Sequence, residues 1–126
     1  MKETIIAVVL ITLVVGLCIF TTKYTASFCD EIYASVSDCV TAVRQNDWEL
    51  AKKHIEAAED AFDKKSSVLE AFVMHQDISE AHGVVLKISA AVDAKATDIC
   101  ISEATSLLGQ IRRLSESDRL TLSNIL

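Results

Sequence analysis

The sequence predicts an all-α protein, in which an N-terminal transmembrane helix is followed by a small antiparallel helical bundle of about four helices. Three observations support this fold class. The 126 residues contain no proline, the residue that most often breaks a helix. Residues 5–22 carry no charge. Farther along the chain, apolar residues recur at alternating spacings of three and four, which places them on one face of a helix.

The uncharged run at residues 5–22 (IIAVVLITLVVGLCIFTT) has the length of a membrane span. As an α-helix it is about 27 Å long, close to the roughly 30 Å of a bilayer's hydrocarbon. The alternative is a cleaved signal peptide, whose apolar region is shorter and is followed by a small-x-small site. Residues 25–27 (TAS) match such a site only weakly, so we expect a retained signal-anchor. The predicted organisation is a membrane anchor over residues 1–22 and a bundle domain over residues 23–126.

The charges beside the run predict its orientation. Lys2 and Lys23 flank it, and the N-terminal amine adds a slight positive excess at the start. Because the more positive end stays in the cytoplasm, we expect a single-pass protein of the bacterial cytoplasmic membrane with its bundle on the extracytoplasmic side. The net charge of -6 argues against a nucleic-acid partner, since that binding needs a positive surface.

Four apolar stripes predict the helices of the bundle, and short polar connections between them predict antiparallel neighbours. The stripes are Cys29, Ile32, Val36, Cys39 and Val43; Trp48, Ala51, Ile55, Ala58, Phe62, Leu69 and Phe72; Ile78, Ala81, Val85, Ile88 and Val92; and Cys100, Ala104, Leu107, Ile111 and Leu114. We expect Trp48, Ile55, Phe62, Ile88, Leu107 and Ile111 to be mostly buried. The expected helix caps are Asn46 with Glu49, Asp77 with Glu80, and Thr97 or Asp93.

Several of these residues also form a pattern, which is Asp47-Trp48-x-x-Ala51, then Phe62, Leu69, Phe72 and His75-x-x-Ile78, with Asn124-Ile125-Leu126 at the end. On this pattern the chain resembles the family called domain of unknown function 4363. The resemblance implies a short bacterial protein with one N-terminal membrane helix and a helical remainder. It implies no activity, because none is established for that family.

The sequence has no signature of catalysis. Its three glycines, Gly16, Gly83 and Gly109, lie too far apart for a phosphate-binding loop, and neither a nucleophile elbow nor a His-Glu-x-x-His motif occurs. We therefore expect no catalytic residues, no cofactor and no enzyme.

Histidines give the nearest approach to a site. His75, Asp77 and His82 are weak candidates for zinc ligands. The alternative, which we favour, is that His75 satisfies carbonyl groups at a helix end while Asp77 caps the next helix, so that no metal is bound.

The cysteines of the bundle offer a second candidate. In an up-down-up-down bundle the first and fourth helices are neighbours, and Cys39 and Cys100 both fall near the end distant from the membrane. A Cys39–Cys100 disulfide can therefore form in an oxidising compartment. The alternative, which we favour, is that Cys29, Cys39 and Cys100 are all buried as small apolar residues.

These features favour a membrane-anchored extracytoplasmic interaction or structural module of a bacterial cell envelope, which binds a protein partner or a second copy through its helical faces. The alternative is a ligand- or metal-sensing bundle. Because only residues 1–3 would lie inside the cell, such a sensor would act through a partner membrane protein.

Overall fold

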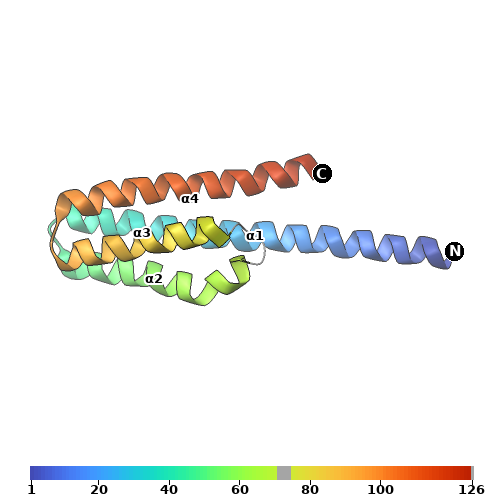
Figure 1. The fold of residues 1–126 in the computed structure, drawn as a ribbon, viewed down its shortest axis with the longest axis horizontal. Helices are drawn as coiled ribbons and strands as arrows, with labels where there is room; N and C mark the ends of the chain where they lie inside the picture. The colour runs from blue at the N-terminus through green and yellow to red at the C-terminus, as the bar shows by residue number, and fades with distance from the viewer. Residues whose placement is uncertain (71–74, 126) are drawn as a thin grey trace.

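Within the part of the chain that the structure describes, four helices follow one another, and Figure 1 shows their arrangement. In the computed structural model they are α1 (Lys2–Arg44), α2 (Trp48–Glu70), α3 (His75–Asp93) and α4 (Thr97–Ile125). The structure describes residues 1–70 and 75–125, without the side chains at 66, 70, 75, 76 and 117–125. No strand occurs within these described ranges, which confirms the predicted all-α class.

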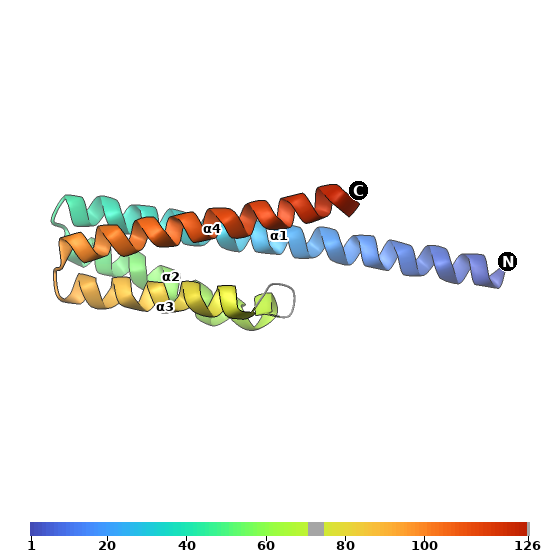
Figure 2. The same cartoon turned by 45° about the horizontal axis from the view of Figure 1, so that its top comes forward.

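The helices form a ring of antiparallel neighbours (Figure 2). Helix α1 packs against α2 and α4, and α3 packs between α2 and α4 on the other side. The turns at residues 45–47 and 94–96 both lie at the end of the bundle farthest from the N-terminus, which we call the distal end. This is the up-down-up-down arrangement expected from the short connections.

The core consists of the apolar stripes that the sequence predicts. Ile55, Phe62, Ile88 and Leu107 are 0% exposed and Ile111 is 2% exposed. Trp48 is buried for the larger part but not completely, and it packs against the edge of the core. It is the first residue of α2 and therefore lies at the distal end of the bundle. Phe72 lies outside the described residues.

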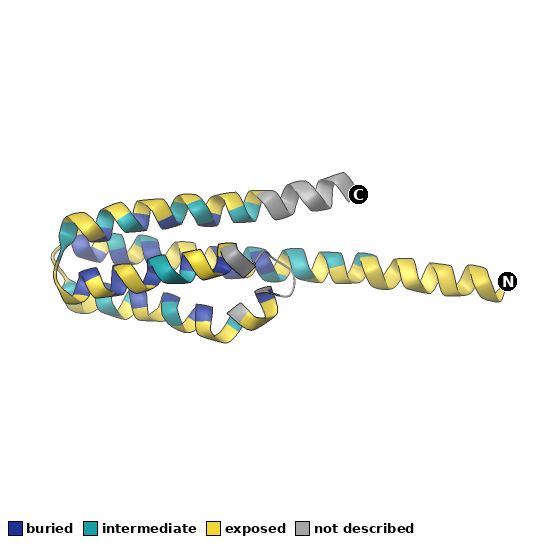
Figure 3. Cartoon of the chain, viewed as in Figure 1, coloured by how far each residue is buried: buried dark blue, intermediate teal, exposed yellow. Residues whose placement is uncertain are grey.

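Helix α1 joins two very different environments without a break (Figure 3). Large apolar side chains of its first half are exposed, among them Ile11 and Leu13 at 63% each. In its second half, Phe28, Ile32 and Val36 are 0% exposed and lie in the core. Within the described residues, α1 is the one helix long and apolar enough to cross a membrane.

Both distal turns have the same backbone geometry. After α1, the amides of Asn46 and Asp47 donate to the carbonyls of Val43 and Ala42, at 3.0 and 2.9 Å. After α3, the amides at 95 and 96 bond in the same way to the carbonyls at 92 and 91. These paired bonds define the Schellman motif, whose key residue takes a left-handed conformation. Asn46 (φ 58) and Lys95 (φ 54) are those residues.

The predicted caps are displaced from the real ones. Asn46 ends α1 rather than capping α2, and Asp47 is the cap, because its Oδ1 accepts the Leu50 amide at 3.2 Å. Helix α3 begins at His75, so Asp77 lies in its first turn instead of preceding it. Helix α4 begins at Thr97 itself.

Candidate functional site

Cys39 and Cys100 are neighbours in the core near the distal end. Cys39 lies in the last two turns of α1 and Cys100 in the first turn of α4, each is 1% exposed, and both are free. Burial, together with the smaller effect of the neighbouring Cys100 charge, raises the pKa of Cys39 from 9.0 to about 11. Burial also raises the pKa of Cys100.

These pKa directions define what the thiol pair can do. The thiolate is the reactive form of cysteine, and a buried thiol in an apolar environment stays protonated and inert. The pair is therefore unsuited to nucleophilic catalysis at neutral pH. Its position between two neighbouring helices is that of a structural pair, and the disulfide between Cys39 and Cys100 stays a prediction.

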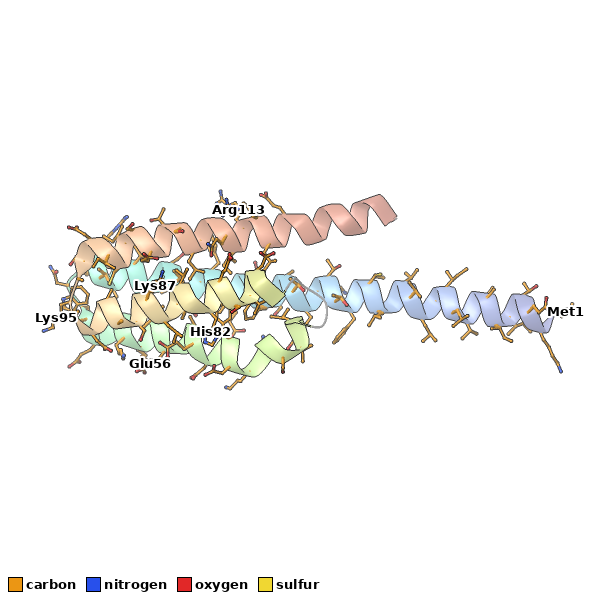
Figure 4. The ribbon with its side chains drawn as sticks, viewed as in Figure 1. Met1, Glu56, His82, Lys87, Lys95 and Arg113 are labelled. Carbon is orange, nitrogen blue, oxygen red and sulfur yellow. The ribbon has the colours of Figure 1, made fainter. Side chains whose placement is uncertain are left out.

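The proposed metal ligands do not converge in the part of the chain that the structure describes. His82 points from α3 towards α2 (Figure 4), where its ring stacks on Phe62 at 5.3 Å and its Nε2 lies 3.8 Å from Asp63 Oδ1. Asp77 instead faces α4, because five residues along a helix correspond to a rotation of about 140°. The His75 side chain lies outside the described residues. No group of three or more potential metal ligands occurs among those that are described.

A groove between α3 and α4 is a feature that the sequence did not indicate. It has a volume of about 290 Å³ and is lined by Asp77, Glu80, Ala81, Gln110, Ile111, Arg113 and Leu114. The Oε1 atom of Gln110 is buried there without a hydrogen-bond partner. An unpaired buried acceptor costs free energy. Arg113 is the cation among the residues that line this groove.

Two lysines tie α2 to its neighbours. Lys52 Nζ lies 2.8 Å from Asp93 Oδ1 and 3.4 Å from Ser89 Oγ of α3, and the hydrogen bond with Asp93 is the main cause of its raised pKa. Lys65 Nζ lies 2.8 Å from Glu31 Oε2 of α1 and 5.8 Å from the centre of the Tyr24 ring. Such partners lie more than thirty residues apart in sequence, and for that reason helical spacing alone did not reveal them.

The family comparison covers the bundle. The model of the family described as "Domain of unknown function (DUF4363)" matches residues 19–125. The chain belongs to this family. The matched region of DUF4363 begins near the end of the apolar run and includes the buried half of α1 together with α2, α3 and α4. The description of the family assigns no activity to it. The chain has no match among curated proteins and none among solved structures.

Proposed function

We propose that this member of DUF4363 is a membrane-anchored interaction or structural module of the bacterial cell envelope, with its bundle on the extracytoplasmic side. The observation that carries the proposal is the continuity of α1, which runs from exposed apolar residues into the buried core in one helix. A helix whose apolar side chains are exposed all round needs an apolar surrounding, which lipid provides.

Hydrogen bonding within α1 supports its place in a membrane. The hydroxyls of Thr12, Thr21 and Thr22 donate to the carbonyls of Val8, Leu17 and Cys18, at 2.7–2.9 Å. Lipid offers no partner to a polar group, so hydroxyls inside a span must be satisfied by the protein itself. The anchor is retained in this proposal rather than removed as a signal peptide, because α1 continues without a break through residues 25–27 into the core.

The module acts by binding rather than by catalysis in this proposal. Its buried thiols stay protonated at neutral pH. The His82 ring stacks on Phe62, and its Nε2 atom lies next to the carboxylate of Asp63. The exposed faces of long helices are surfaces on which a partner helix can pack.

Protease accessibility tests the anchor and its orientation together. We expect the full chain of 13.8 kDa to stay in the membrane fraction after alkaline carbonate washing, and to be digested when protease is added to intact protoplasts. A soluble, shortened chain would contradict the retained anchor. Digestion only after lysis would reverse the orientation.

The groove between α3 and α4 favours a second candidate function, a ligand-sensing bundle. The carboxylates of Asp77 and Glu80, which line this groove together with Gln110, suit a small ligand with hydrogen-bond donors. Crosslinking in the native membrane separates the two functions. A crosslinked protein partner supports the interaction module, whereas a small molecule that copurifies with a chain without partners supports the sensor.

A further inference from the structure

Helix α4 is much longer than α3, the neighbour with which it shares a turn. It runs from Thr97 to Ile125, whereas α3 covers only His75–Asp93. Both helices start or end at the distal turn, so the additional length of α4 extends past the other end of the bundle. Figures 1 and 2 show this end of α4 beyond the ends of α2 and α3, on the same side as the first half of α1.

The height of this end follows from the helical rise. Arg44 ends α1 at the distal end of the bundle and Thr97 begins α4 there. At about 1.5 Å per residue, Lys23 lies about 32 Å from Arg44, and Arg119 lies about 33 Å from Thr97. Lys23 is the first charge after the apolar run, and Arg119 is the last charge of α4 before its sequence continues as LTLSNI. Positions 23 and 119 of the backbone therefore lie at about the same height on neighbouring antiparallel helices.

The length of the uncharged run restricts where along α1 the membrane surface can lie. Between Glu3 and Lys23 the uncharged residues 4–22 form a helix of about 28 Å, barely enough for a hydrocarbon layer of about 30 Å. The surface must therefore lie near Lys23. Residues 120–125 of α4 continue about 9 Å past that height, and they include Leu120, Leu122 and Ile125 but no charge.

We propose that residues 120–125 at the end of α4 enter the bilayer surface beside α1 and form a second contact between the bundle and lipid. This inference rests on the proposed membrane anchor. The agreement in height between Lys23 and Arg119 carries it, because long basic side chains at a membrane surface keep their charge in water while the apolar residues beyond them enter lipid. Over these residues the helix reaches about 9 Å past the height of Lys23, so we place the segment in the interface next to the span.

Tryptophan fluorescence in lipid vesicles tests the contact. The full chain carries Trp48→Phe, which removes its single tryptophan, and is reconstituted into phosphatidylcholine vesicles brominated near the top of the acyl chains. Three single tryptophans are then compared, which are Leu122→Trp at the end of α4, Leu13→Trp in the span, and Ser106→Trp at an exposed site in the distal half of α4. Helical content by circular dichroism checks each variant, and Ile125→Trp replaces Leu122→Trp if that variant unfolds.

We expect bromine to quench Leu122→Trp as strongly as Leu13→Trp and to leave Ser106→Trp unquenched. Quenching of Leu13→Trp with Leu122→Trp as bright as Ser106→Trp would overturn the second contact and leave the anchor intact. Absence of quenching at all three positions would overturn the anchor, and the second contact with it.

Discussion

Leu107 illustrates how single residues hold the bundle together. Its side chain is 0% exposed in the core, between partners supplied by neighbouring helices. We expect Leu107→Ala to lower the free energy of unfolding by about 2–5 kcal/mol, because truncation of a buried side chain leaves a cavity. Urea unfolding of the full chain in mild detergent measures this loss. Leu86→Ala is the matched control, since Leu86 is 51% exposed, and it should change stability by less than about 0.5 kcal/mol.

The raised pKa of Cys39 predicts a loss of stability in alkali. Below pH 9 this thiol is protonated in both the folded and the unfolded chain, so it has no effect on the pH dependence. Between pH 9 and about 11 the unfolded chain loses its proton first, and stability falls as pH rises. We expect Cys39→Ala to lose less stability than the natural chain between pH 8 and 11. If the free energy of unfolding falls equally in both chains over this pH range, the prediction is contradicted.

Oxidation of the same thiols tests the predicted disulfide. A diazene oxidant removes two hydrogen atoms from a thiol pair, joins the two sulfur atoms and is itself reduced to the hydrazine. Because the buried thiols are inert in the folded chain, the oxidant is added during refolding from urea, and we expect Cys39 and Cys100 to pair while Cys29 keeps its alkylation label in mass spectra. The closed loop of about 60 residues should raise stability by about 4 kcal/mol in the chain-entropy model. Three labelled bundle cysteines after oxidation would exclude the bond.

Residue spacing predicted the core better than it predicted the site. Burial at Ile55, Ile88 and Ile111 follows from period alone, because the apolar face of a helix must turn inward. The groove at Gln110 and the pairing of Lys52 with Asp93 depend on how far each helix is rotated about its axis. That rotation is set by packing between helices, and the spacing of apolar residues within one helix carries no information about it.

At the scale of helices and turns, the sequence predicts that a helix is present more reliably than it predicts the residues at which the helix begins and ends. Asn46 and Asp47 are both good capping residues, so their order alone could not tell which one caps α2. The structure assigns the left-handed position to Asn46, since asparagine tolerates that conformation better than most side chains, and Asp47 then becomes the cap. The continuity of α1 from the apolar run into the bundle was likewise not determined by the stripes.

The turn between α3 and α4 offers a direct test of this geometry. Lys95 holds a φ of 54, which costs a non-glycine residue roughly 1–2 kcal/mol, whereas glycine adopts it freely. We expect Lys95→Gly to raise the free energy of unfolding by about 1 kcal/mol. The control is Lys87→Gly, at an exposed position inside α3, which should lower it by about 1 kcal/mol. Destabilisation by both changes would mean that the turn is not left-handed at residue 95.

At the scale of the whole molecule, α1 acts as a rigid support. It leaves the apolar run and enters the core within a few residues, from Phe20 at 56% exposed to Thr25 at 0%. Helix α1 has no flexible linker between these two positions. The bundle should therefore stand upright on the membrane, and a second contact through α4 would also fix its rotation about α1.

The height of Trp48 above the membrane measures this upright posture. Trp48 begins α2 at the distal end, so it should lie about 30 Å above the surface near Lys23. Energy transfer from this single tryptophan to headgroup-labelled lipid in phosphatidylcholine vesicles should therefore be weak. A Gly-Ser linker inserted after Lys23 should raise the transfer, because it lets the bundle lie on the surface at a height of about one helix diameter, about 10 Å. Strong transfer in the natural chain, equal to that with the linker, would mean that α1 bends at the membrane and that the bundle lies flat.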